Sequence, residues 1–74
     1  MNLQRTIEVA RAAARIEGPG PLSTGEALTA ALVLNRADWL AEMDYTIAEA
    51  LDRIDSDTVR QLREAERVLR REVP

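Results

Sequence analysis

The sequence contains no cysteine, no histidine and no lysine, and these absences exclude several kinds of protein. Without cysteine there are no disulfides, and without cysteine and histidine the commonest zinc ligands are missing. Nucleophilic catalysis usually needs a Ser, Cys or Lys beside a base, which is commonly His. The only serines, Ser23 and Ser56, stand where helices are expected to begin, so we assign both to helix capping. We therefore predict no enzyme, no catalytic or cofactor-binding residue, no metal site and no small-molecule substrate.

Large apolar side chains are also scarce. The chain has 74 residues, no Phe, one Trp and one Tyr, and twelve of its apolar residues are Ala. A chain of this length forms one small core, so we predict a single domain over residues 1–74. Such a core leaves roughly 3–5 kcal/mol of net stability, and self-association is the remaining way to add to it. No apolar run approaches the ~20 residues that cross a bilayer, so we expect a cytoplasmic protein without membrane contact.

The pattern of apolar residues is helical throughout. Spacings of three and four residues predict an all-α fold, a compact bundle of about four to five helices and no strands. The expected helices span 3–17, 24–34, 36–43, 47–54 and 57–72. Pro and Gly interrupt the pattern over residues 18–22, which form a linker after the first helix.

Polar residues mark where these helices begin and end. Gly18 fits the left-handed position after the first helix, and Asn35 can both end the second helix and cap the third. Two Ser/Thr residues are followed three positions later by Glu, which is the spacing of a capping box. The expected N-caps are Asn2, Ser23 with Glu26, Thr46 with Glu49, and Ser56.

Each expected helix has an apolar face. The second helix is apolar almost all the way round, which predicts burial on most sides. The first carries Leu3 and Ile7, widened by Val9 and Ile16, and a small-residue face that permits close helix approach, Ala10, Ala13 and Ala14. The inward residues of the fourth are expected to be Ile47, Ala48, Ala50, Leu51 and Ile54, and those of the last Val59, Leu62, Ala65 and Leu69.

Charge is distributed unevenly along the chain. Residues 23–57 carry eight carboxylates and two Arg, whereas residues 58–74 carry five Arg and three Glu. In the last helix a basic ridge of four arginines lines one stripe, Arg60, Arg63, Arg67 and Arg70. The ridge has two interpretations. It is either a solvated face with ion pairs inside the chain, such as Glu66 with Arg70, or a surface that contacts a second copy of the chain or another partner.

Residues 46–62, TIAEALDRIDSDTVRQL, resemble the helix-turn-helix of bacterial DNA-binding proteins. That motif has about five residues and a Gly between its last apolar residue and its Thr-Val pair. Here only three residues separate Ile54 from Thr58, and the turn presents Asp52, Asp55 and Asp57. Because carboxylates repel phosphates, nucleic acid is possible as a partner but not favoured.

A second resemblance covers residues 34–54, LNRADWLAEMDYTIAEALDRI. This segment is similar to small uncharacterised all-helical proteins of proteobacterial integrative and conjugative elements, in which an NRxDWL and a YTxxEA block recur. The resemblance implies an accessory role in a mobile element and assigns no residue a function. Large aromatics are enriched at interfaces, so the candidate interface is Trp39, Leu40, Met43 and Tyr45, although burial in a core is the simpler interpretation of Trp39.

These observations favour a non-enzymatic helical protein-protein interaction or accessory protein. The partner is expected to be the chain itself, as a homodimer, or another protein. In the homodimer the helix at 24–34 and a face of the first or last helix would be shared. Two alternatives stay open: a helix-turn-helix-like DNA-binding regulator that uses the basic ridge, and an acidic inhibitor of a nucleic-acid-binding protein.

Overall fold

The fold is all-helical, as the sequence predicts. The computed structural model describes residues 1–72, which form five α-helices and no strand. The helices are α1 Leu3–Ile16, α2 Thr24–Val33, α3 Ala37–Glu42, α4 Ile47–Arg53 and α5 Ser56–Glu72. Every end of these helices lies within one residue of the predicted one, and the expected tandem of two short helices is present as α3 and α4.

Helix starts follow the predicted caps in three of five cases. The Asn2 side chain accepts the N–H of Arg5 at 2.8 Å. Both capping boxes are formed, Ser23 with Glu26 before α2 and Thr46 with Glu49 before α4. The backbone N–H of Thr46 donates to Glu49 at 2.9 Å, and this bond is the main cause that lowers the pKa of the Glu49 carboxyl. These three starts are therefore encoded locally.

The other two starts differ from prediction. Asp55, not Ser56, caps α5: its Oδ1 accepts the N–H of Thr58 at 2.8 Å, so Ser56 is already the first helical residue. Asn35 ends α2 in the left-handed region, at φ 57°, but does not cap α3. Arg36 occupies that N-cap position, and its side chain accepts no hydrogen bond from the first turn, so α3 begins without a capping side chain.

The end of α1 also lies one residue earlier than predicted. Glu17, not Gly18, has the left-handed conformation, at φ 55°. The N–H of Gly18 donates to the carbonyl of Ala13 at 3.1 Å, and the N–H of Glu17 donates to that of Ala14 at 3.4 Å. This is the Schellman pattern, which places a residue with positive φ directly after the last helical residue. Gly20, at φ 51°, is the glycine whose conformation an L-residue rarely adopts.

A Gly20→Ala variant is expected to be less stable than the wild type by about 1 kcal/mol, because alanine is strained at positive φ. Its added Cβ would also meet Cδ1 of Ile16, but that side chain is 56% exposed and can rotate away. Gly18→Ala is the matched control. No heavy atom lies within 4 Å of its added Cβ and its φ is not positive, so it should unfold no earlier than the wild type in urea. Equal loss in both variants would contradict the assignment of strain to Gly20.

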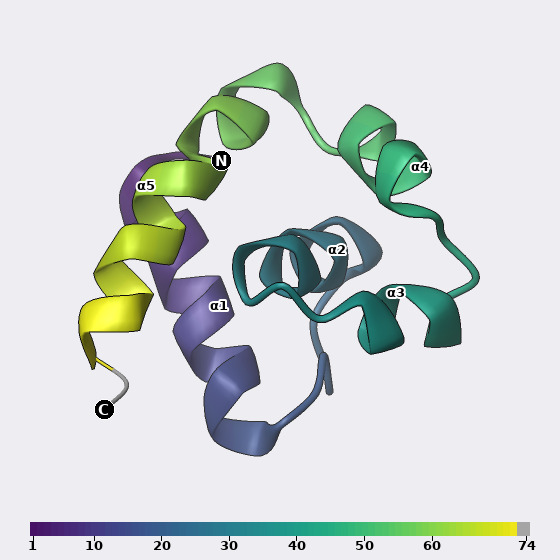
Figure 1. Cartoon of the computed structure of the whole chain (residues 1–74), viewed down its shortest axis with the longest axis horizontal. Coiled ribbons are helices and arrows are strands. Elements are labelled where there is room, and N and C mark those ends of the chain that lie inside the picture. Colours follow the sequence, from purple (N-terminus) through teal and green to yellow (C-terminus); the bar gives the residue numbers. More distant parts are fainter. Residues whose placement is uncertain (73–74) are drawn as a thin grey trace.

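Helix α2 forms the centre of the fold, and all four other helices pack against it (Figure 1). Six of its ten residues are buried, and Leu28, Ala30 and Ala31 are completely inaccessible to solvent. The prediction that α2 is buried on most sides is therefore confirmed. Its own chain provides that burial, so a dimer that shares the face of α2, as the sequence suggested, does not agree with the structure. Of its large apolar residues only Leu32 is partly exposed, as is Leu34 directly after the helix.

Helices α1 and α5 lie side by side and cover one flank of α2 (Figure 1). Ala10 and Ala13 of α1 are fully buried, so the predicted close approach takes place within one chain, whereas Ala14 and Ile16 are exposed, contrary to expectation. Arg11 of α1 and Glu72 of α5 form an ion pair at 2.5 Å. The first helix therefore packs against its own chain.

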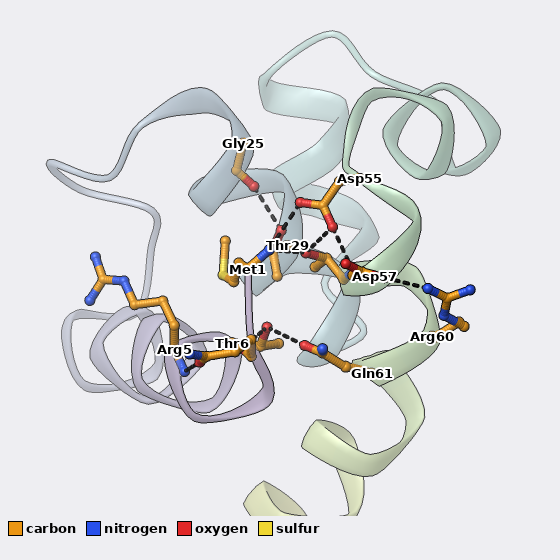
Figure 2. Close-up of polar contacts among 11 residues, drawn as sticks. Met1, Arg5, Thr6, Gly25, Thr29, Asp55, Asp57, Arg60 and Gln61 are labelled. Atoms are coloured by element: carbon orange, nitrogen blue, oxygen red, sulfur yellow. Dashed lines mark hydrogen bonds and ion pairs between the residues drawn. The ribbon is translucent and has the colours of Figure 1, made fainter.

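Buried threonines add polar contacts that the sequence patterns did not reveal. Thr6, Thr29 and Thr58 are inaccessible to solvent, and each hydroxyl is hydrogen-bonded. Thr6 donates to the carbonyl oxygen of Asn2 at 2.9 Å and also contacts Gln61 of α5 at 3.3 Å (Figure 2). Such bonds offset the free energy that burial of a hydroxyl costs.

Asp55 joins the start of α5 to the start of α1. Its Oδ1 accepts hydrogen bonds from the N–H and the hydroxyl of Thr58, and its Oδ2 lies 3.0 Å from the α-amino group of Met1 (Figure 2). These contacts stabilise the ionised carboxylate. The backbone N–H of Thr58 is the largest cause, followed by the α-amino group, and together they lower the pKa of Asp55 from 3.8 to about 2.

This lowered pKa predicts acid sensitivity. A carboxyl whose pKa is lower in the folded state stabilises the fold above its unfolded value and loses that contribution as the pH falls through the folded value. For Asp55 the window therefore runs from about pH 4 to about pH 2. Asp55→Asn keeps an oxygen that can cap α5 but cannot ionise, so its melting temperature should fall less steeply across that window. Asp52→Asn, which removes a carboxylate away from a helix start, is the control, and identical slopes in wild type and Asp55→Asn would contradict the assignment.

Candidate interaction surface

Helix α4 exposes the apolar side chains that were predicted to face inward. Ile47 is 57% and Leu51 37% exposed, and Ala48 is exposed as well. Ala50 is fully buried, and Ile54, which follows the helix, is 9% exposed. Because α4 has only seven residues, it packs on α2 through one narrow side, and the expected inward set is wrong for Ile47, Ala48 and Leu51.

A second apolar wall comes from the first half of α5. Ala65 and Leu69 are buried as predicted, but Leu62 is only partly buried and Val59 is 37% exposed. Val59 and Leu62 are three residues apart and so lie on the same side of the helix. The expected inner stripe of α5 therefore divides into a buried part and a part that faces the solvent.

Between these walls lies a hollow of about 240 Å³, here called the α4–α5 groove. Its apolar lining includes Ala31, Leu32, Leu40, Ile47, Leu51 and Leu62. Figure 1 shows α4 and α5 on opposite sides of the central α2. Ala31 and Leu32, near the end of α2, belong to the lining of the groove. Four helices thus contribute apolar side chains to one concave, open surface.

Asn35 connects this groove to a second hollow. That hollow, of about 190 Å³, is bounded by the end of α2 and by Glu66, Leu69 and Arg70 of α5, and Asn35 lines both. The left-handed conformation of Asn35 turns the chain at this point and brings Arg36 to the edge of the groove. The two hollows therefore lie next to each other, with Asn35 in the lining of both.

Arg36 is fixed at that edge. Its guanidinium lies 4.4 Å from the centre of the Trp39 ring and donates two hydrogen bonds to Asp38, at 3.0 and 2.7 Å. Those bonds are the main reason why the pKa of the Asp38 carboxyl is lowered. Stacking on an aromatic ring and bidentate pairing both restrict the guanidinium, so Arg36 forms a defined edge of the groove.

The helices on the two sides of the groove differ little in net charge. Helix α4 holds Glu49, Asp52 and Arg53, which give −1, and α5 holds five Arg, Asp57 and three Glu, which give +1. The charged residue in the lining of the groove itself is Arg36. Arg63 and Arg70, whose side chains are 69% and 70% exposed, both pair with Glu66 of α5.

The four residues of the predicted interface do not form one exposed surface. Trp39 and Leu40 are each only 3% exposed, and Met43 and Tyr45 are half-buried against the same core. The burial of Trp39 agrees with its interpretation as a core residue. Leu40 does reach the groove, where it lines the floor. The other three contribute to packing between α2, α3 and α4.

All four residues of the basic ridge are exposed, and each is paired with a carboxylate of α5 itself. Arg60 pairs with Asp57, Arg67 with Glu64 at 3.3 Å, and Glu66 receives both Arg63 at 2.5 Å and Arg70 at 3.6 Å. The predicted pair of Glu66 with Arg70 is present. Pairs of this kind on an exposed helix contribute little to stability, so the ridge agrees with a solvated face.

Comparison with protein-family models, with curated protein sequences and with solved structures finds no match to this chain. Within residues 1–72, no three acidic side chains lie close enough together to hold a metal ion. None of the helices in that part of the chain combines the length and the apolar character that crossing a membrane requires. The function must therefore be argued from the surface that the fold creates.

Proposed function

We propose that the chain is a non-enzymatic protein-protein interaction protein and that the α4–α5 groove is its binding surface. The observation that carries the proposal is the exposure of Ile47 and Leu51 beside a concave apolar hollow. Scattered apolar residues are normal on a protein surface, but a contiguous apolar depression with a polar edge is typical of an interaction site. Ile47 and Leu51 are two of the few large apolar residues of this chain, and while they are exposed they do not stabilise its core.

The groove suits an amphipathic helix. Helix-in-groove recognition uses apolar side chains at positions i, i+3 or i+4 and i+7 of the bound helix, with charged residues at the edge. The lining from four helices gives the floor, and Arg36 on one edge and the α5 arginines on another supply polar partners. The bound partner is accordingly an apolar helical face with charges beside it.

The chemistry available to the chain supports a non-enzymatic role. Cys, His and Lys do not occur in the sequence, and the hydroxyl of Ser23 accepts the N–H of Glu26 in a capping box. Ser56 begins α5. No contact in the described residues favours the regulator or the inhibitor interpretation over this one. The accessory role in a mobile element stays a prediction.

Site-specific photo-crosslinking tests the proposal. A photoreactive amino acid replaces Ile47 in one variant and Ile16 in another, because the two side chains are equally exposed and only Ile47 lines the groove. In cells that naturally express the chain, the Ile47 variant should form a discrete adduct with a protein, either the chain itself or another one. Adducts at Ile16 alone, at neither position, or with nucleic acid would contradict the proposal.

A further inference from the structure

Met1 carries the only primary amine of this chain, because the sequence contains no lysine. Its α-amino group lies 3.0 Å from Oδ2 of Asp55 and 3.0 Å from Oγ1 of Thr58 (Figure 2). Thr58 is inaccessible to solvent, and the Met1 side chain is only 18% exposed and packs against the main core cluster. The nitrogen is therefore held where the start of α1 meets the start of α5.

The Asp55 carboxylate serves both of these helices. Its Oδ1 caps α5, and its Oδ2 binds the ammonium that precedes α1. A contact between an ammonium and a carboxylate is charge-assisted, which makes it stronger than a hydrogen bond between neutral groups. Asp55 is 58% exposed, so solvent screens part of the attraction. The joint between the two helix starts therefore depends on a positive charge at the Met1 nitrogen.

We infer that the α-amino group of Met1 is a modification site, and that an acetyl group there opens the joint between α1 and α5. In the transfer the ammonium loses one proton, and the nitrogen lone pair attacks the carbonyl carbon of an activated ester or thioester. The C–N bond forms, the leaving group departs with the electron pair of its broken bond to that carbon, and the nitrogen loses a second proton. The product is a neutral amide with a single N–H, which cannot form an ion pair with Asp55.

The space around the amine accepts a small acyl group. A hollow of about 280 Å³ adjoins the nitrogen, and its lining includes Met1, Asp55 and Thr58. Acetylation therefore acts through the loss of charge and of hydrogen bonds, and it does not require the chain to move aside for the added atoms.

The expected effect has the opposite sign to that of acetylation on an ordinary helix. A positive charge beside a helix N-terminus opposes the helix dipole, so its removal stabilises the helix. Met1 directly precedes Asn2, the N-cap of α1. On that ground alone acetylation would raise the melting temperature, whereas the loss of the partner of Asp55 lowers it. The direction of the change therefore separates the joint from a general effect on α1.

Thermal unfolding of the full chain, synthesised with a free or an acetylated α-amino group, tests the inference. The acetylated wild type should melt about 2–6 °C below the free form. Asp55→Asn in the same two forms is the control, because asparagine still caps α5 but carries no charge. Acetylation of that variant should leave the melting temperature unchanged or raise it. An acetylated wild type that melts no lower than the free form would overturn the inference, and so would an equal fall in Asp55→Asn.

The rate of acetylation tests the same joint without depending on stability. With the N-hydroxysuccinimide ester of acetic acid, only the Met1 amine can form an amide, since the chain has no lysine. The ammonium must leave Asp55 and Thr58 before its nitrogen can react, so Asp55→Asn should gain the acetyl group several times faster than the wild type in mass spectra. Asp52→Asn, which keeps both contacts of the amine, should react at the wild-type rate. Equal rates in all three chains would contradict the assignment of the joint to Met1 and Asp55.

Discussion

Leu28→Ala is expected to lose about 2–5 kcal/mol of unfolding free energy, which is the range for removing a fully buried leucine. Leu28 is the largest of the completely buried side chains and lies in the main core cluster with Val9, Trp39 and Leu40. A core of this size leaves roughly 3–5 kcal/mol of net stability. The variant should therefore have a net stability near zero, so a substantial fraction of it should be unfolded at 25 °C when its helical circular dichroism is measured at micromolar concentration.

Leu51→Ala is the control for this loss, since it removes the same atoms from a side chain that is 37% exposed. It should cost less than about 1 kcal/mol at the same concentration, because surface substitutions rarely change stability by more. If both variants unfolded to the same extent, Leu51 would belong to the core and the α4–α5 groove would not exist as described.

Ala13→Leu is expected to destabilise the chain by about 1–3 kcal/mol, the usual effect of forcing extra methylene groups into a packed core. Ala13 has no solvent exposure and lies in the cluster that contains Leu28, Ala30 and Ala31 of α2. Its small side chain lets α1 approach α2 closely. A leucine there must push the two helices apart, which urea unfolding will report as a lower midpoint.

The neighbouring substitution Ala14→Leu isolates the effect of packing from that of helix propensity. Ala14 is exposed on the same helix, and alanine and leucine differ little as helix formers. Its unfolding free energy should stay within about 0.5 kcal/mol of the wild type. A loss at Ala14 as large as that at Ala13 would show that α1 packs in a different register from the one described.

The elements of this fold were predictable because their signals are local. A capping box needs only two side chains three residues apart, so the starts of α2 and α4 could be predicted from Ser23 with Glu26 and from Thr46 with Glu49. Pro and Gly after α1 end that helix whatever surrounds it. The burial of α2 was also predictable, since a helix that is apolar all round must be covered on most sides.

The groove was not predictable in the same way. The spacing of apolar residues shows that a helix has an apolar face, but it does not show whether another helix covers that face. Ile47 and Leu51 have the spacing of residues that face inward. The way in which α4 packs on α2 nevertheless buries Ala50 and leaves Ile47 and Leu51 exposed. Asp55 was missed as the cap of α5 because Ser56, one residue later, is an equally good capping residue by type. The length of α4, seven residues with four apolar ones, is the signal that could have suggested surplus apolar surface.

The central claim is that the apolar side chains of α4 form a surface used for binding and not part of the core. Methyl spectra of the purified chain, recorded before and after addition of the protein that Ile47 crosslinks in cells, test it most directly, because each Ile, Leu and Val methyl reports its own surroundings. We expect the signals of Ile47 and Leu51 to shift together when that protein is added, while those of Ile7, Leu28 and Ile16 stay in place. Shifts centred on Ile16, or none on addition of that protein, would contradict the claim.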